Sequence, residues 1–232
     1  MTRTDQRKVA IIGISRGIGR GLATEYLHRG WSVVGTARHA LSDADTAAIG
    51  GGSAPLQVER LDLSRPEEIA ALHEHLTGER FDVLLVVAGV SDGDVPVAQM
   101  EVEAFNEVMD INALAPLKVV EALQDLVADD GTIAVMSSNQ GSITLNDQGG
   151  FEVYRASKTA LNQLMRSYAV RHRDDARALL LVTPGWVQTN LGGPNAPMTV
   201  EQSASAVIDV IEARRHARGL HYVDHRNETV PW

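Results

Sequence analysis

Cysteine is absent from this chain of 232 residues. Its absence excludes a thiol nucleophile, a zinc site with cysteine ligands and any disulfide. Basic residues are also few, because 21 Lys and Arg stand against 30 Asp and Glu and leave a formal net charge of −9. Nucleic acids and anionic membranes need a basic face to neutralise phosphate, so neither is an expected partner.

Long hydrophobic segments are missing as well. Residues 1–8 are polar and lack the apolar stretch of a signal peptide. The longest apolar run, Val83–Val90, is far shorter than the roughly 20 residues that span a bilayer. We therefore expect a cytoplasmic protein without a membrane partner. The eight histidines form no H-E-x-x-H motif or other paired ligand spacing, so no metal site is expected.

Short apolar segments alternate with amphipathic ones along the whole chain. The apolar segments are rich in Val, Ile and Leu, which is typical of parallel strands covered by helices on both faces. The predicted strands are Val9–Gly13, Ser32–Ala37, Leu56–Leu61, Val83–Ala88, Thr132–Ser137, Ala178–Thr183 and Leu220–Val223. The predicted helices are Ile18–Arg29, Pro66–Leu76, Glu101–Val127, Phe151–His172 and Val200–His216. This alternation predicts an α/β fold: one doubly wound, Rossmann-type domain over residues 1–232, with a parallel sheet of about seven strands.

Local signals mark some element ends. Ser64 and Glu67 have the spacing of a capping box, and Pro66 suits the first turn of a helix. Thr199 is a predicted N-cap of the last helix. The glycine cluster 50–52 predicts a surface turn before the third strand.

The first predicted strand runs directly into a glycine-rich segment with the spacing G-x-x-x-G-x-G. A dinucleotide pyrophosphate needs a tight turn, a close backbone approach and a helix N-terminus aimed at its charge. An ordinary strand–helix turn is the alternative, but the position between the first strand and a helix favours a dinucleotide site. We expect cofactor contacts from Gly13, Ser15, Arg16, Gly17, Ile18 and Gly19.

Two arginines indicate which dinucleotide is bound. The second strand is followed by Arg38, with no carboxylate to hold a ribose 2′-hydroxyl. An arginine there can pair with the 2′-phosphate of NADP, and Arg16 could reach the same phosphate from the glycine loop. The alternative is that both are solvated surface residues. We expect NADP(H) to be preferred over NAD(H).

Tyr154 and Lys158 are spaced to share one face of a helix. A free tyrosine has a pKa of about 10 and is a poor proton donor or acceptor near neutrality. A nearby ammonium favours the phenolate and is expected to lower that pKa. Such a tyrosine could donate a proton to a carbonyl oxygen or accept one from an alcohol.

The glycine loop, Ser138, the Tyr154/Lys158 pair and Pro184-Gly185 occur in the order and spacing of the short-chain dehydrogenase/reductase family, which the chain resembles over essentially its whole length. A closer resemblance is to the C-factor-like branch, through Tyr154–Lys158, Pro184–Thr189, Gly192–Pro197 and Val230–Trp232. The resemblance implies an oxidoreductase that reduces an aldehyde or ketone with NADP(H), or oxidises the matching alcohol.

The same resemblance assigns roles to four side chains. Ser138 would hydrogen-bond the substrate oxygen, and Tyr154 would transfer the proton. Lys158 would bridge the nicotinamide ribose hydroxyls and lower the pKa of Tyr154. Asn112 matches a helix asparagine that holds a water behind the lysine, although a purely structural helix kink is the alternative.

Further cofactor contacts are implied beyond the glycine loop. Asp62 resembles a residue that contacts the adenine amino group, with a helix-capping carboxylate as the alternative. Val187 and Thr189 would meet the nicotinamide carboxamide. The remaining expected contacts are Leu63, Ala88, Gly89, Pro184 and Gly185.

The chain departs from the family pattern after the fourth strand. Val86-Val87 replaces the usual Asn-Asn, and Ile12 replaces a threonine before the glycine loop. Well-packed valines can replace a hydrogen-bonded polar pair at little cost in stability. The departure therefore bears on local loop geometry more than on the reaction.

Substrate contacts are expected from loops at the carboxyl ends of the strands. The candidates are Val90, Ser91 and Asp92, residues Gln140–Phe151, and Trp186 and Leu191. Within the second loop, Asn146–Gly150 has a solvated turn as its alternative. Because residues 184–199 offer little chain for a lid, the pocket is expected to be open, around a small carbonyl or alcohol substrate.

Two long predicted helices carry apolar positions beyond one buried stripe, including Leu161, Leu164 and Met165. The family resemblance then implies a homodimer or homotetramer. Two other functions remain open. One is an NADP(H)-binding regulatory or signalling protein with little turnover, which would not need Ser138, Tyr154 and Lys158 together. The other is a lyase or epimerase, whose larger C-terminal substrate region this chain lacks.

Overall fold

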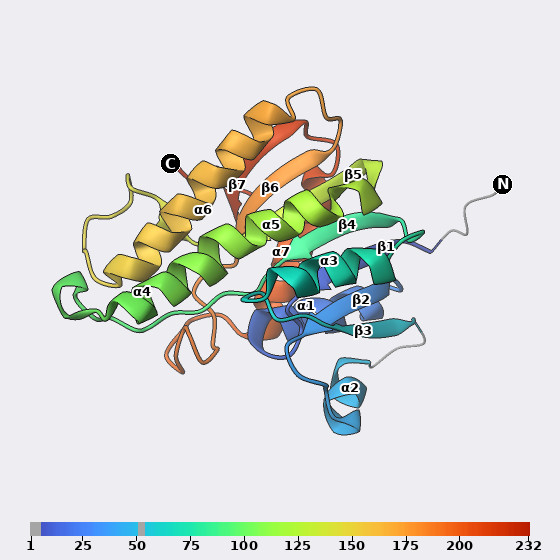
Figure 1. The fold of residues 1–232 in the computed structure, drawn as a ribbon, viewed down its shortest axis with the longest axis horizontal. Coiled ribbons are helices and arrows are strands. Elements are labelled where there is room, and N and C mark those ends of the chain that lie inside the picture. The colour runs from blue at the N-terminus through green and yellow to red at the C-terminus, as the bar shows by residue number, and fades with distance from the viewer. Residues whose placement is uncertain (1–5, 51–53) are drawn as a thin grey trace.

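The computed structural model describes residues 6–50 and 54–232, in which seven strands form one parallel sheet (Figure 1). The strand order is β3-β2-β1-β4-β5-β6-β7, so the chain reverses its direction of winding between β1 and β4. Ligands of open α/β sheets bind outside the carboxyl ends of the strands at such a reversal. The strands are β1 Lys8–Ile12, β2 Ser32–Ala37, β3 Leu56–Arg60, β4 Phe81–Val86, β5 Val127–Met136, β6 Ala178–Thr183 and β7 Gly219–Asp224.

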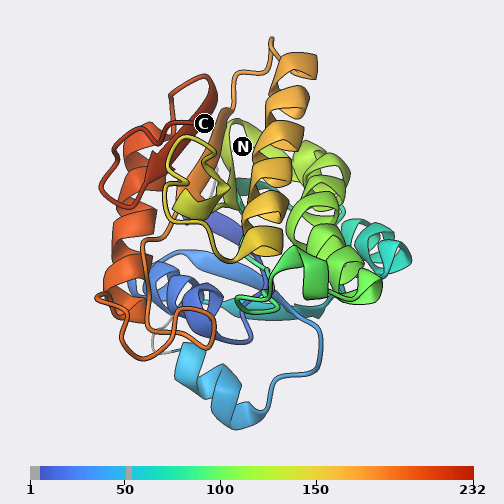
Figure 2. The same ribbon diagram turned by 90° about the vertical axis from the view of Figure 1, so that its left-hand side faces the viewer.

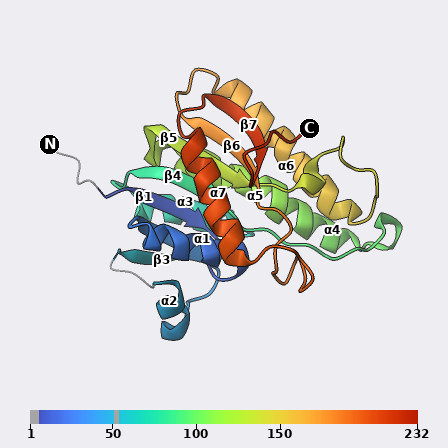
Figure 3. The same ribbon diagram turned by 180° about the vertical axis from the view of Figure 1, so that it is seen from behind.

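Helices cover both faces of the sheet. The helices α3, α4, α5 and α6 lie on one face (Figure 1), and α1 and α7 pack together on the other (Figure 3). Buried apolar side chains accordingly form two clusters, one around Phe81 and Tyr222 and the other around Tyr26 and Trp31. The expected doubly wound Rossmann-type architecture is confirmed. The helices are α1 Gly17–His28, α2 Asp43–Ile49, α3 Pro66–His75, α4 Val102–Met109, α5 Ala115–Leu123, α6 Glu152–Arg171 and α7 Val200–Arg214.

The predicted helix Glu101–Val127 is wrong as a single element. A π-helical segment, Asp110–Leu114, joins α4 to α5, and a short 3-10 turn precedes β5, which already begins at Val127. The wider π turn holds the buried side chain of Asn112, whose amide bonds the backbone of a neighbouring loop. Sequence periodicity does not register one extra residue in a turn.

Other local predictions had mixed outcomes. The capping box Ser64/Glu67 is wrong, because the N-cap of α3 is Arg65 and the Glu68 carboxylate instead accepts the backbone N–H of Asp62. Thr199 is confirmed as the N-cap of α7, in a full capping box with Gln202. Pro66 does lie in the first turn of α3. Residues 51 and 52 of the predicted glycine turn lie outside the described residues.

Helix α2 was not predicted, because it is short and buries only Ile49. On α6, Leu161 and Met165 are fully buried in the core and cannot contribute to a subunit contact as expected, whereas Leu164 is 39% exposed. Within residues 6–50 and 54–232 we find no helix with the length and apolarity needed to cross a membrane.

Candidate active site at the carboxyl edge of the sheet

The glycine loop after β1 is tightly folded against the start of α1. The backbone N–H of Gly13 donates to Thr36 Oγ1 at 3.0 Å, and a Cβ on Gly19 would lie 1.8 Å from the Gly13 carbonyl oxygen. The N-cap of α1, Arg16, makes no side-chain cap, and the first turn contains no acidic residue. The first N–H groups of α1 are therefore left for an external anion, as a dinucleotide pyrophosphate requires.

Arg16 and Arg38 flank this loop as exposed side chains. Neither guanidinium has a hydrogen-bond or ion-pair partner among the described residues. Nearby, Asp62 closes a turn before α3, where its carboxylate accepts the N–H and hydroxyl of Ser64 at 3.0 and 2.7 Å. The Ser64 hydrogen bonds, with a smaller contribution from Arg38, hold the pKa of Asp62 below its usual range. The helix-capping alternative for Asp62 is wrong, while the adenine contact stays a prediction.

The sequence did not predict that Arg20 holds the glycine loop in place by hydrogen bonds. The Arg20 guanidinium donates to the Ser15 carbonyl at 2.8 Å and to the Asp45 carboxylate at 2.7 Å, and so ties the loop to α2. A basic residue in the first turn of α1 was visible in the sequence. Its partner was not, because α2 itself was not predicted.

The end of β4 is joined to β1 by backbone hydrogen bonds. The N–H groups of Val87 and Ala88 both donate to the Ile12 carbonyl, at 3.0 and 3.1 Å. Val86 is buried and Val87 packs against the core, so the two valines fill the positions of the usual asparagines with apolar contacts. A Cβ on Gly89 would lie 3.3 Å from Asn112 Oδ1 and 3.6 Å from Lys158 Nζ.

The side chain of Asn112 is committed to structural hydrogen bonds. Its Oδ1 accepts the Val90 N–H, and its Nδ2 donates to the Val90 carbonyl, both at 2.8 Å. The same Nδ2 donates to Ser157 Oγ at 3.0 Å. A structural role is therefore present. A bound water would have to use the remaining lone pair of Oδ1, on the side near Gly89 and Lys158.

Helix α6 presents Tyr154 and Lys158 one turn apart, beside Ser138 at the end of β5. Lys158 is 3% exposed, its Nζ donates to the Met136 carbonyl at 3.0 Å, and it lies 5.8 Å from the centroid of the Tyr154 ring. Burial lowers the pKa of Lys158 to about 8.

Burial also sets the protonation of Tyr154. It raises the pKa of that phenol to about 12, against the opposing effect of a hydrogen bond with Ser138. The expected net lowering of the Tyr154 pKa is not seen, because loss of hydration outweighs the hydrogen bond with Ser138, and Lys158 is not among the groups that shift this pKa. The phenol is protonated at neutral pH.

The start of α6 is held by the loops on either side of it. Phe151 adopts a left-handed conformation, φ 47°, and its N–H donates to the Asp94 carboxylate at 2.6 Å. Arg155 Nε donates to the carbonyls of Gly149 and Gly150 at 3.2 and 2.9 Å. These contacts fix the first turn of α6, whose N-cap Phe151 lies three residues before Tyr154. Asp94 and Arg155 were not expected to have this role.

The loop after β6 completes the edge. Gly185 has a φ of 82°, and a Cβ there would lie 2.7 Å from Met198 Sδ. Ser203 Oγ donates to the Pro184 carbonyl at 2.8 Å and so anchors the loop to α7. A Cβ on Gly17 would lie 3.5 Å from Thr189 Cγ2, which places this loop beside the glycine loop.

Among the expected cofactor contacts, Val187 and Leu63 are largely buried, whereas Ser15 is exposed. Figure 2 looks onto the carboxyl edge, where the loop after β5 lies beside the C-terminal segment and the loop after β6 lies beside α1. The structure thus brings the glycine loop, Gly89, Asn112, Lys158 and the loop after β6 to one edge of the sheet.

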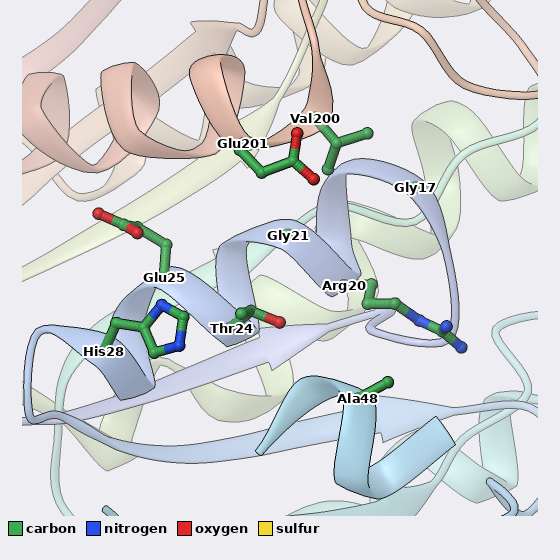
Figure 4. Close-up of a pocket in the computed structure, with 9 residues that line it drawn as sticks. All are labelled: Gly17, Arg20, Gly21, Thr24, Glu25, His28, Ala48, Val200 and Glu201. Carbon is green, nitrogen blue, oxygen red and sulfur yellow. The ribbon is translucent and has the colours of Figure 1, made fainter. Parts of the chain in front are cut away.

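Two cavities adjoin this constellation, and neither includes Tyr154 or Lys158 in its lining. One of about 340 Å³ opens between α1, α2 and the start of α7 (Figure 4). Its charged lining is already partly paired, since Arg20 bonds Asp45 and Glu25 bonds Arg29. The other, of about 270 Å³, lies between α6 and residues 140–150 and does not include Tyr154 in its lining.

The three predicted groups of substrate residues lie in different places. Val90 and Ser91, in the loop after β4, are half-buried, and Asp92 is exposed. Trp186 and Leu191 are 59% and 52% exposed in the loop after β6. Much of the loop Gln140–Phe151 instead lines the smaller cavity on the flank of α6. Asn146–Gly150 is solvent-exposed except for Gly150, as the solvated-turn alternative expects.

Several known proteins are similar to this chain in sequence and in fold. A family model described as enoyl-(acyl carrier protein) reductase matches residues 13–216. C-signal of Myxococcus xanthus is 35% identical over 158 residues, which cover 65% of this chain and 92% of that protein.

Two solved structures cover 98% of this chain and all of their own. A protein from Burkholderia multivorans, described as a short-chain dehydrogenase/reductase with bound NADP, has 43% identity and a TM-score of 0.93. A carbonyl reductase from Pseudomonas aeruginosa PAO1 in complex with NADP has 35% identity and a TM-score of 0.86.

Proposed function

Because the chain belongs to the short-chain dehydrogenase/reductase family, we propose that it reduces an aldehyde or ketone to an alcohol with NADPH, or catalyses the reverse reaction. The observation that supports the proposal is that Lys158 Nζ lies 5.8 Å from the centroid of the Tyr154 ring, while the Tyr154 hydroxyl interacts with Ser138. Two similar structures hold NADP, and one of them is a carbonyl reductase, which supports both the cofactor and the reaction class.

The residues present fit a bound dinucleotide. The uncapped N-terminus of α1 offers N–H groups to a pyrophosphate, and the carboxyl edge of the sheet leads from there to Gly89 and Thr189. When bound, NADPH supplies a hydride to the carbonyl carbon. The enzyme's part is then to orient the carbonyl and to manage the proton on its oxygen.

Tyr154 and Ser138 act on the substrate oxygen in this proposal. The phenol, with a pKa of about 12, is protonated and can donate its proton as negative charge develops on that oxygen. Ser138, the hydrogen-bond partner of Tyr154, would hold the same oxygen and stabilise the charge. Both side chains are held in position before the substrate arrives, so little reorganisation is needed.

Lys158 would assist as a buried cation. With a pKa of about 8 its ammonium is charged at neutral pH, where it favours the phenolate that Tyr154 becomes after donating its proton. Gly89 leaves room beside Nζ, because even a Cβ there would lie 3.6 Å away. In this proposal the same Nζ contacts the nicotinamide ribose, and Asn112 holds a water behind it.

Preference for NADP(H) over NAD(H) is supported by charge. Arg16 in the glycine loop and Arg38 at the end of β2 are exposed and have no hydrogen-bond or ion-pair partner among the described residues. A guanidinium at the end of β2 suits a 2′-phosphate, whereas a carboxylate would suit a ribose hydroxyl.

The test is consumption of reduced cofactor. Purified protein is mixed with NADPH or, separately, NADH, and absorbance loss is followed against a panel of aldehydes, ketones and quinones. We expect turnover of some carbonyls with a preference for NADPH. Absence of NADPH binding in a direct titration would overturn the proposal.

A second candidate is an NADP(H)-binding signalling protein, favoured by the similarity to a protein named C-signal. This candidate predicts NADPH binding without consumption on the whole panel. It also predicts that Tyr154→Phe leaves the biological activity unchanged. The presence of both Ser138 and Tyr154, with a hydrogen bond between their side chains, favours the carbonyl reductase over this second candidate.

A further inference from the structure

Tyr222 is a buried residue of β7 whose hydroxyl reaches the candidate catalytic serine. It is 2% exposed and donates a hydrogen bond to the Ser138 carbonyl at 2.5 Å. Strand β6 lies between β5 and β7, so the side chain spans a whole strand to make this contact. Burial raises the pKa of Tyr222, which keeps its hydroxyl a proton donor.

The segment that receives this bond is a short 3-10 turn, Asn139–Gly141. The Ser138 carbonyl also accepts the Gly141 N–H at 2.8 Å, and Ser138 Oγ accepts the Gln140 N–H at 3.2 Å. These two bonds lie within the turn itself. The Tyr222 bond joins the Ser138 carbonyl to the sheet, and therefore restrains the turn as a whole.

Polar contacts from α6 complete the restraint. Ser137 Oγ donates to Asn162 Oδ1 at 2.7 Å, and Asn162 Nδ2 donates to the Gly141 carbonyl at 3.2 Å. A Cβ on Gly141 would lie 3.0 Å from Lys158 Cβ, so the turn is pressed against the turn of α6 that carries Lys158. A shift of the turn would therefore move Ser138 relative to α6.

Trp232 supports Tyr222 from the solvent side. Its ring lies 5.3 Å from the Tyr222 ring, and the Val230 N–H donates to the Tyr222 carbonyl at 2.9 Å. The Trp232 carbonyl accepts the N–H and hydroxyl of Thr144 at 3.1 and 2.7 Å. Residues 230–232 thus hold both the tyrosine and the loop that follows Ser138.

We propose that Tyr222 is a positioning residue: its hydroxyl fixes the Ser138 carbonyl and thereby orients the Ser138 hydroxyl toward Tyr154 and the substrate oxygen. This inference rests on the proposed carbonyl reduction. Tyr222 is not proposed to touch the reacting atoms. Its hydroxyl also interacts with the side chains of Ser137 and Asn162, which belong to the same restraint, and its proposed effect on the reaction passes through Ser138. Small displacements of a catalytic group have large effects on rate, which gives the hydrogen bond its importance.

Two other buried tyrosines provide matched controls. The Tyr168 hydroxyl donates to Gln124 Oε1 at 2.7 Å, far along α6 from Ser138. The Tyr26 hydroxyl is buried without a partner among the described residues. Replacing each by Phe removes one hydroxyl, so Y168F measures the loss of a buried hydrogen bond and Y26F the loss of a hydroxyl alone.

The kinetic test compares these variants with NADPH and the best carbonyl of the panel. We expect Y222F to lower kcat by about ten- to a hundredfold, with the Kd of NADPH and the KM of the carbonyl changed less than about threefold. We expect Y168F and Y26F to keep the wild-type kcat. An unchanged kcat in Y222F, or an equal fall in Y168F, would overturn the proposal.

Amide hydrogen exchange tests the same restraint without turnover. We expect faster exchange at Gln140, Gly141 and Ser142 in Y222F than in the wild type and Y168F, because their N–H groups bond Ser138 and Asn139. Unchanged exchange there would overturn the restraint. If the wild type reduces no carbonyl, the proposed function fails, and the exchange experiment alone decides whether Tyr222 holds the turn.

Discussion

At the scale of single residues, burial sets the protonation of the two central side chains. Tyr154 has a pKa of about 12 and is neutral, whereas Lys158, with a pKa of about 8, is charged at neutral pH although it is 3% exposed. A buried ammonium opposes folding, because the unfolded chain hydrates it better. The fold therefore carries a cost in stability at Lys158.

Replacing Lys158 by Met tests that cost. Its pKa is 10.5 when hydrated and about 8 when folded, so the folded state binds the proton less tightly. The wild type therefore becomes more stable as the pH rises from about 8 to 10.5. At pH 7 we expect Lys158→Met to raise the free energy of unfolding by about 1–3 kcal/mol, at roughly 1.4 kcal/mol per pKa unit less the lost hydrogen bond.

Urea unfolding at pH 7 and pH 10 measures both effects. The gain should shrink at pH 10, where the wild-type lysine is largely neutral. A loss of stability at pH 7, or the same gain at both pH values, would contradict a buried, charged Lys158. We expect Lys158→Met to be inactive as a reductase whatever its stability.

Arg38 provides a residue-scale test of cofactor choice. We expect Arg38→Ala to weaken NADPH binding by about ten- to a hundredfold, the effect of one lost charge-assisted hydrogen bond, and to leave NADH binding unchanged. Arg80→Ala is the control. Arg80 immediately precedes β4, its side chain is 48% exposed, and it pairs with Asp129 of β5. Equal losses for both cofactors would show that Arg38 does not read the 2′-phosphate.

At the scale of elements, much of the fold follows from the sequence because apolar strands and glycine punctuation are local signals. The seven strands and the N-cap at Thr199 could be predicted in this way. The π segment around Asn112 could not, because it depends on a hydrogen bond to Val90, 22 residues away. Helix α2 was missed because a short, exposed helix has no apolar periodicity.

The candidate site divides in the same manner. Tyr154 and Lys158 share a helix, so their proximity is readable from spacing. The contacts of Asp94 with Phe151 and of Tyr222 with Ser138 join segments far apart in the chain and needed the structure. The direction of the Tyr154 pKa shift was also mistaken, because burial is not visible in a local motif.

The capping box of α7 gives an element-scale prediction. Thr199 Oγ1 accepts the Gln202 N–H at 3.2 Å, and the Gln202 side chain accepts the Thr199 N–H at 2.9 Å. We expect Thr199→Ala to lower the free energy of unfolding by about 1 kcal/mol. Gln202→Ala and the double variant complete the cycle in urea unfolding. If the loss of stability in the double variant equals the sum of the losses in the two single variants, the two side chains do not cap the helix jointly, which would contradict the capping box.

At the scale of the whole molecule, exposed apolar side chains lie on the helices that cover one face of the sheet. They are Val102, Leu114, Leu164 and Val170, each at least 39% exposed. Leu114 lies in the π segment between α4 and α5, and Leu164 and Val170 lie on α6. The prediction of a homodimer or homotetramer therefore rests on these exposed positions and no longer on the buried Leu161 and Met165.

Sedimentation equilibrium of the wild type and Leu164→Glu tests that prediction. We expect the wild type to be at least a dimer. The dissociation constant of the variant should be about tenfold higher than that of the wild type or more, because the new carboxylate would be buried in the subunit interface. Gln163→Glu, an exposed neighbour on α6, is the control. A wild-type monomer would contradict the prediction.

The most direct test of the proposed chemistry is NADPH consumption by the wild type, Tyr154→Phe and Tyr168→Phe with the best carbonyl of the panel. If Tyr154 is the proton donor, Tyr154→Phe should bind NADPH normally but lose at least about a hundredfold in kcat, while Tyr168→Phe keeps the wild-type rate. Equal turnover by the wild type and Tyr154→Phe would contradict the account.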